Sequence, residues 1–381
     1  MTTTYGLLST YPPTACGLAT FTASLVAQLG GPVGRGADCR VIRAMDVRDG
    51  LSPPGVVSEL VAGSRRSQRS AIDALNDVDV AIVQHEYGIF GGPDGDEVLA
   101  VLSALTVPVI VVVHTVVVEP TCHQRDVLEA VVDIADVVVT MTQTARRRLA
   151  DGYAVDMSKV TVIPHGAHVV PLPDPMTGAS SGDRPIILTW GLLGPGKGIE
   201  WGIDALGLMR DLRPSPRYLI VGKTHPKVLD THGEAYRTSL VRRARRRGVS
   251  ADVEFDATYL DVPELQRIVR QAALVLLPYD SPDQITSGVL IEAVAAGKPV
   301  VSTRFPHAVE LLGGGVGLLV GHRDPAAIAV AVRRVLTDEP LRATMAAAGE
   351  GLAPDLGWPA VANRYRAVAA ELLASRAAEV A

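Results

Sequence analysis

The stretch QITSGVLIEAVAAGKPVV, residues 284–301, combines a polar loop, an apolar helix and the start of a strand. Ser287 is a strong N-cap residue, and Gly288 leaves room for a ligand to approach the backbone. The helix therefore begins with unpaired N–H groups and the positive end of its dipole, an anion site suited to a diphosphate. Glu292 lies just over one turn further, where its carboxylate could accept hydrogen bonds from both hydroxyls of a ribose. These features predict a nucleotide site, although an ordinary buried helix with a Ser-Gly cap is compatible with the same residues.

Outside this stretch, short runs rich in Val, Ile and Leu alternate with helical segments along nearly the whole chain. The runs are apolar at consecutive positions, which is typical of strands buried on both faces of a parallel sheet. We predict helices over 121–135, 231–248 and 325–349, and an amphipathic terminal helix from Trp358 to about Leu373. We predict about six strands in each half of the chain: 5–10, 39–43, 80–85, 109–114, 137–141 and 160–164, then 186–190, 218–222, 252–255, 274–278, 299–303 and 316–320.

A segment rich in Pro, Gly, Ser and Asp interrupts this alternation near the middle of the chain. Such composition without helical or strand periodicity indicates an interdomain linker. We predict an α/β protein with two Rossmann-like domains, at 1–168 and 185–355, joined by a linker at 169–184 and followed by a C-terminal helix at 356–381.

The composition excludes several classes of function. The 381 residues fit two domains, and a net charge of −5 argues against a general nucleic-acid-binding protein. Three scattered cysteines form neither a disulfide framework nor a zinc motif, so a reducing cytoplasm is the simplest expectation. The N-terminus has no signal-peptide pattern, and the most apolar run, 107–118, is too short for a membrane span.

The second half opens with a glycine-rich loop, TWGLLGPGKGIEW, at 189–201. Lys197 is the cation at the entry to the next helix, an arrangement that suits a phosphate. The loop is not a Walker motif, because Gly198 stands where Ser or Thr is required. Lys223, after the next strand, could supply a further charge, although a solvated lysine explains it as well.

Polar residues follow several strands of the first half. A loop with Gly17 precedes a helix expected to begin near Ala19; it suits either a ligand contact or a plain strand-to-helix turn. His114 ends a very apolar strand, where it is either a structural residue or a ligand contact. His85 and Glu86 end another strand and could face a bound substrate or frame a cleft. His165 near the linker could touch the edge of that cleft, although packing at a hinge explains it better.

The segment from Gln284 to Glu292 resembles the glutamate-x7-glutamate element of family 4 glycosyltransferases, the retaining group 1 enzymes of the GT-B fold. The resemblance implies that Glu292 holds the donor ribose and that Gln284, in place of the first Glu, contacts the sugar. The loop with Gly191 and Lys197 resembles the family's glycine, arginine, then lysine-glycine loop, which binds the donor diphosphate. Leu192 stands where the family has the arginine, so one cation is missing.

The resemblance assigns further residues to the donor. It implies that the amides of Ser287, Gly288 and Val289 bind the diphosphate, that the backbone at Gly17 approaches the donor phosphates, and that His114 contacts the sugar hydroxyls. It also implies that the first domain takes the acceptor, that the two domains face each other across a cleft, and that the terminal helix packs back on the first domain.

The function so implied is retaining transfer of a mannose- or glucose-type hexose from a nucleotide diphosphate sugar, of GDP or UDP type, to a hydroxyl acceptor. We expect no metal and no cofactor besides this donor, because no Asp-x-Asp motif stands at a strand end. Two alternatives remain: a sugar-nucleotide epimerase, and a degenerate protein that binds the nucleotide sugar without turnover. The arginines between Arg237 and Arg247 indicate a solvated helix more than a membrane contact.

Overall fold

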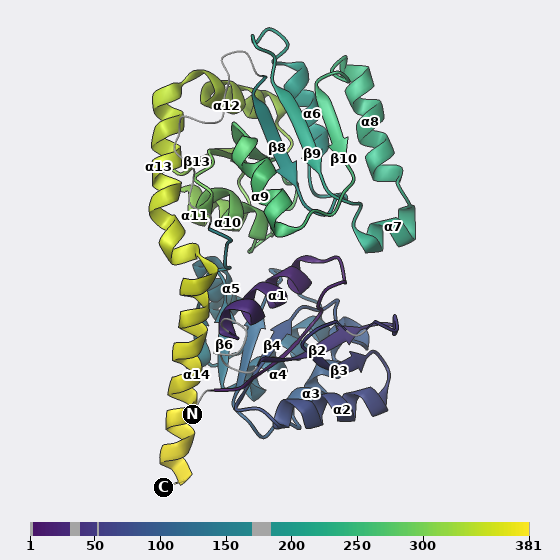
Figure 1. The fold of residues 1–381 in the computed structure, drawn as a ribbon, viewed down its shortest axis with the longest axis vertical. Helices are drawn as coiled ribbons and strands as arrows, with labels where there is room; N and C mark the ends of the chain where they lie inside the picture. Colours follow the sequence, from purple (N-terminus) through teal and green to yellow (C-terminus); the bar gives the residue numbers. More distant parts are fainter. Residues whose placement is uncertain (1–2, 31–38, 52, 170–183, 381) are drawn as a thin grey trace. The chain divides into compact units, whose positions relative to one another are not determined.

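The computed structural model describes residues 3–30, 39–51, 53–169 and 184–380 (Figure 1). The chain forms two compact units, Met1–Gly166 with Trp358–Ala381, and Ala167–Gly357. Nearly all of the predicted linker at 169–184 lies outside the described residues. Within the described ranges, no helix combines the length and the apolar character needed to cross a membrane.

The first unit contains a parallel seven-stranded sheet in the order β3-β2-β1-β4-β5-β6-β7. Six of these strands were predicted, and their cores are apolar and buried as expected. The prediction missed β3, because its sequence VVSELV mixes polar with apolar residues and the strand lies at the sheet edge, where it is largely half-exposed. The strands are β1 (Tyr5–Ser9), β2 (Cys39–Met45), β3 (Val56–Val61), β4 (Val80–His85), β5 (Val109–Val113), β6 (Val137–Thr140) and β7 (Val160–Val162).

The terminal helix α14 (Trp358–Val380) belongs to the first unit. Trp358, Val361 and Tyr365 are buried in one apolar cluster with Phe21 and Leu25 of α1. The helices of this unit are α1 (Gly17–Leu29), α2 (Arg65–Asn76), η1 (Pro93–Gly95), α3 (Glu97–Leu102), α4 (Cys122–Ile134), α5 (Gln143–Gly152), η2 (Met157–Lys159) and α14.

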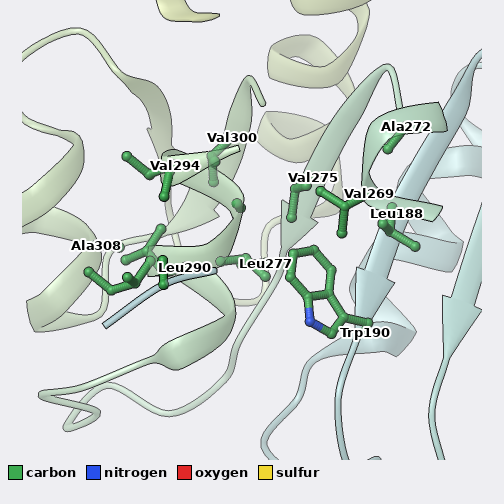
Figure 2. Packing of buried hydrophobic residues seen from close by; sticks show 14 of the residues in the cluster. Leu188, Trp190, Val269, Ala272, Val275, Leu277, Leu290, Val294, Val300 and Ala308 are labelled. Atoms are coloured by element: carbon green, nitrogen blue, oxygen red, sulfur yellow. The ribbon is translucent and has the colours of Figure 1, made fainter. Parts of the chain in front are cut away.

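The second unit contains a parallel sheet whose six strands coincide with the six predicted runs, in the order β10-β9-β8-β11-β12-β13. Figure 2 shows part of its core, in which Leu277 of β11 lies between Leu290 of α10 and Trp190 of β8. The strands are β8 (Ile186–Trp190), β9 (Arg217–Val221), β10 (Val253–Asp256), β11 (Leu274–Leu277), β12 (Val300–Thr303) and β13 (Gly317–Val320).

Two predicted helices of this unit are each divided in two. Gly233, with φ of +56°, ends α7, and Asp338 ends α12 and caps α13 by accepting a hydrogen bond from the amide of Leu341. The helices are α6 (Ile199–Gly207), α7 (Pro226–His232), α8 (Ala235–Arg247), α9 (Val262–Gln271), α10 (Gly288–Ala295), α11 (Pro306–Leu312), α12 (Pro325–Thr337) and α13 (Glu339–Leu356).

The basic helix α8 is not simply solvated. Arg243 and Arg247 each donate two hydrogen bonds, of 2.7–2.8 Å, to the buried carboxylate of Asp204 on α6. Burial alone would raise the pKa of Asp204, but the hydrogen bonds from both arginines outweigh it and lower the pKa to about 2. These two arginines therefore fasten α8 to α6.

Candidate functional site

The strand order of the second unit reverses at β8, which lies between β9 and β11. Ligands of open parallel sheets bind beyond the carboxyl ends of the strands at such a switch point. Two loops leave the sheet there: the glycine loop 191–198 after β8, and the segment 278–287 after β11. Both were predicted to carry site residues.

These two loops are fastened to each other. The amide of Asp280 donates to the Gly196 carbonyl at 2.8 Å, and the Ser281 hydroxyl donates to the same carbonyl at 3.3 Å. Gly198 has a φ of +61°, and a Cβ at this position would lie 1.8 Å from the Pro278 carbonyl oxygen. Glycine is therefore required at 198 both by the left-handed backbone and by this close approach.

Lys197 places its ammonium group 4.3 Å from the centroid of the Tyr279 ring. Tyr279 is fully buried and stacks on Phe305 with ring centroids 5.2 Å apart. A cation over an aromatic face is attracted without being neutralised. The contact therefore fixes the position of Lys197 and leaves its full positive charge available for an anion.

The start of α10 has the predicted cap. The Ser287 hydroxyl accepts a hydrogen bond from the amide of Leu290 at 3.2 Å, and the Ser287 amide donates to Nδ1 of the buried His307 at 2.9 Å. The amides of Gly288 and Val289 take part in none of the hydrogen bonds found among the described residues. The first turn of α10 thus presents two free donors at its positive end.

The glycine loop and the start of α10 lie side by side. A Cβ at Gly191 would be 3.6 Å from Cγ2 of Val289, and Gly191 has a φ of +117°, which favours glycine. One cationic side chain and one helix N-terminus therefore meet at the same edge of the sheet, an arrangement that binds phosphate.

Glu292 has a partner that the sequence did not reveal. His168 donates to its carboxylate from the ring Nδ1 at 2.8 Å and from the backbone amide at 3.1 and 3.2 Å. The Gln266 side chain in turn donates to the His168 carbonyl at 3.2 Å. The carboxylate is thereby oriented within the second unit. Because 124 residues separate the pair, no local sequence signal indicates it.

Gln284 and Leu192 are the two positions that depart from the family pattern. The side-chain amide of Gln284 donates to the Thr286 carbonyl at 3.0 Å, a bond that a glutamate could not make. Its backbone carbonyl accepts from the His307 amide at 3.5 Å, which joins Gln284 to the cap of α10. Leu192 is half-buried and offers no polar group to the loop.

The first unit holds the remaining predicted residues. His114 donates from Nε2 to the side-chain oxygen of Gln84 at 2.6 Å, and its ring meets Phe21 edge-on at 5.1 Å. Burial, then the nearby His165 and His85, lower the pKa of His114 to about 3, so the ring is neutral at pH 7. Its Nδ1 is then an acceptor, able to receive a hydrogen bond from a hydroxyl.

His85 and His165 are mainly packed residues. Burial lowers the pKa of His85 to about 4, and its Nδ1 has no hydrogen-bond partner among the described residues. His165 packs against Phe21, with ring centroids 5.0 Å apart, and against Trp358 at 5.7 Å. Both therefore contribute to the interior of the first unit.

Helix α1 begins at Gly17, two residues earlier than the predicted start at Ala19. The reason is that Cys16 acts as the N-cap, its sulfur accepting a hydrogen bond from the Ala19 amide at 3.4 Å. A Cβ at Gly17 would meet no atom within 4 Å, so packing does not require glycine there.

Glu86, which follows β4, accepts a 2.6 Å hydrogen bond from the Thr115 hydroxyl.

The structure therefore gathers most of the predicted site in the second unit, whereas Gly17 and His114 belong to the first. Among the described residues, no group of three or more His, Cys, Asp or Glu side chains is arranged to hold a metal ion. The gathered residues are Gly191, Lys197, Gln284, Ser287, Gly288, Val289 and Glu292.

Comparison with known protein families identifies the part of the chain that carries this site. Residues 184–338 match the family model described as glycosyl transferases group 1. The chain contains a group 1 glycosyltransferase domain. This match covers all the residues gathered at the edge of the second sheet and confirms the predicted relationship.

Curated relatives carry the same type of name. The chain is 30% identical over 275 residues to D-inositol 3-phosphate glycosyltransferase of Kineococcus radiotolerans, an alignment covering 66% of this chain and 60% of the relative. It is 30% identical over 244 residues to the GDP-mannose-dependent alpha-(1-6)-phosphatidylinositol monomannoside mannosyltransferase of Mycolicibacterium smegmatis, covering 61% of each. The chain thus spans about 60% of the length of these relatives.

Solved structures share the fold of this chain. Anabaena HepE in complex with UDP and glucose superposes with a TM-score of 0.72 at 16% identity, covering 97% of this chain and 100% of that chain. The likeness shows the fold, two Rossmann-like domains of the GT-B type.

Proposed function

We propose that the protein is a retaining glycosyltransferase that moves a mannose- or glucose-type hexose from a nucleotide diphosphate sugar to a hydroxyl acceptor. The observation that carries the proposal is the placement of Lys197 and of the free amides of Gly288 and Val289 along one sheet edge. Glu292 follows the amides on the same helix and is suited to the ribose hydroxyls.

The chemistry follows from the charge that develops on the leaving group. As the glycosidic bond breaks, the nucleoside diphosphate gathers negative charge. Lys197 and the first amides of α10 stabilise that charge, and a fixed cation and fixed dipoles need no reorganisation during the reaction. In this proposal protein groups do the work that a metal would otherwise do, and transfer needs no metal ion. The acceptor hydroxyl attacks from the face that the diphosphate leaves, and its proton passes to the departing phosphate oxygen.

The donor is proposed to carry guanine or uracil. This choice is supported by a relative named as a GDP-mannose-dependent mannosyltransferase and by a similar structure that holds UDP and glucose. The acceptor is proposed to be a carbohydrate or another polyol hydroxyl.

Gln284 and Leu192 favour a second candidate, a protein that binds the nucleotide sugar without turnover. Leu192 offers no charge to the diphosphate, and Gln284 commits its amide to the Thr286 carbonyl. A third candidate, an epimerase, would need acid and base groups at the site. The two candidate carboxylates speak against it, because Glu292 is already hydrogen-bonded to His168 and Glu86 to Thr115.

Turnover of labelled sugar nucleotides separates these candidates. The protein is incubated with UDP-glucose, UDP-galactose, GDP-mannose and ADP-glucose, with and without a panel of polyol acceptors and with and without a chelator. The proposal predicts acceptor-dependent release of one nucleoside diphosphate, unaffected by the chelator, with the anomeric configuration of the donor kept in the product. Conversion of the sugar without acceptor would indicate an epimerase, and binding without release would indicate the degenerate protein.

A further inference from the structure

A histidine outside the predicted site is fixed against the glycine loop. His225 follows β9, the strand next to β8. The Leu193 amide donates to the Lys223 carbonyl at 2.8 Å, and the His225 amide donates to the Leu193 carbonyl at 2.8 Å. A Cβ at Gly194 would lie 3.9 Å from the Cβ of His225. Two backbone hydrogen bonds therefore hold this residue beside the loop.

The orientation of the His225 ring is fixed as well. The amide of Lys227 donates to its Nδ1 at 3.2 Å, so the neutral ring carries its proton on Nε2. Burial, then the positive charges of Lys227 and Lys197, lower the pKa of His225, which keeps the ring neutral at pH 7. Within the described residues, Nε2 makes no hydrogen bond.

The surroundings of this N–H donor select a negatively charged partner. Lys197 and Lys227 are both close enough to act on the ring electrostatically. The adjoining loop contributes glycines and the apolar Leu192, so it supplies no other side-chain donor besides Lys197. A fixed N–H donor, a lysine and a glycine loop at the end of adjacent strands form a suitable cradle for phosphate oxygens.

We propose that His225 donates a hydrogen bond from Nε2 to a phosphate oxygen of the bound nucleoside diphosphate, as a second side-chain donor beside Lys197. This inference rests on the proposed function, because it takes the glycine loop to be the diphosphate site. It assigns a binding role to a residue outside the family pattern on which the site was predicted.

Two substitutions separate the two nitrogens of the ring. His225→Asn keeps an acceptor at the place of Nδ1, and therefore the bond from Lys227, but lacks Nε2. His225→Gln places an amide N–H near Nε2 but loses the bond to Lys227. His232→Asn serves as the matched control, because it makes the same replacement at an exposed histidine at the end of α7. Affinity for UDP, GDP, uridine and guanosine is measured by titration calorimetry on the full chain.

The proposal predicts that His225→Asn weakens binding of the preferred diphosphate about 10- to 100-fold, the range for a hydrogen bond to a charged group. Binding of the matching nucleoside stays unchanged, His225→Gln retains most of the affinity, and His232→Asn resembles wild type. Unchanged affinity in His225→Asn, equal losses in His225→Asn and His225→Gln, or a larger loss in His232→Asn would overturn the inference alone. A wild type that binds neither diphosphate would overturn the proposed function as well.

Discussion

At the residue scale, the sequence predicted the groups that lie near each other along the chain and missed the distant partners. Ser287 caps α10 as expected, because capping depends on residues three apart. The bond between His168 and Glu292 could not be predicted, since the two residues meet only after the second unit has folded. The contact between Lys197 and the Tyr279 ring could not be predicted either, because these two residues also meet only in the folded unit.

Lys197 gives the most direct test at this scale. Lys197→Met keeps an aliphatic chain over Tyr279 but removes the charge, so folding is preserved while the diphosphate loses its cation. We expect kcat to fall about 10²- to 10³-fold, the usual cost of removing one preorganised charge-stabilising donor. Steady-state kinetics with the preferred donor check this, with Lys197→Arg expected to keep much of the activity. If Lys197→Met were as active as wild type, Lys197 would be a surface residue that does not stabilise the diphosphate.

Gln284 tests whether the departure from the family pattern reduces activity. Gln284→Glu replaces the amide that donates to the Thr286 carbonyl by a carboxylate that repels it. Because one intramolecular hydrogen bond contributes about 1 kcal/mol, we expect kcat/KM to fall roughly fivefold. The same assay on Gln284→Ala gives the cost of losing the bond without the repulsion. Higher turnover in Gln284→Glu than in wild type would support the degenerate candidate.

At the scale of elements, strands buried on both faces were predictable because their apolar runs are continuous. The edge strand β3 was missed because it is only partly buried and carries polar residues. The helix breaks at Gly233 and Asp338 were also missed: Gly233 ends α7, and Asp338 both ends α12 and caps α13. The attachment of α8 to α6 through Asp204 depends on a contact between elements and has no local signature.

The lowered pKa of Asp204 predicts how the free energy of unfolding depends on pH. Its folded pKa of about 2 lies below the unfolded value of 3.8, so its contribution is present above pH 3.8 and is lost as the pH falls through 2. We expect Asp204→Asn to lower the free energy of unfolding by about 1.5–3 kcal/mol at pH 7, and the difference from wild type to shrink towards pH 2.

Urea unfolding at several pH values measures this difference. Asp211→Asn is the matched control, because Asp211 pairs with Arg333 but its side chain is 67% exposed. Water screens that pair, so the control should unfold close to wild type. A stability difference for Asp204→Asn that is constant between pH 7 and pH 2 would contradict the proposed role of the carboxylate.

At the scale of the whole molecule, two Rossmann-like sheets were predictable from the spacing of apolar runs and the break between them. The resemblance implied that α14 belongs to the first unit. The physical cause is the apolar face of α14, because Trp358, Val361 and Tyr365 are buried in the core of that unit. The linker prediction falls on residues outside the described chain.

Removing α14 should affect one unit more than the other. Ending the chain at Gly357 uncovers the apolar cluster around Phe21 and Leu25, whereas the core of the second unit keeps its own residues. We expect amides of β4 and β5 to lose protection from hydrogen exchange while those of β8 and β11 keep theirs. Equal loss of protection in both sheets would contradict the division into separate cores.

The central claim is that the glycine loop with Lys197 and the start of α10 bind a nucleoside diphosphate. Thermal unfolding with UDP, GDP and ADP, each with and without a chelator, tests it on wild type and Lys197→Met. A ligand at a hundred times its dissociation constant stabilises by roughly 2.7 kcal/mol, or about 5–11 °C for domains of this size. We expect a chelator-insensitive shift with one diphosphate that Lys197→Met largely removes. No shift with any of the three, or a shift that Lys197→Met leaves intact, would contradict it.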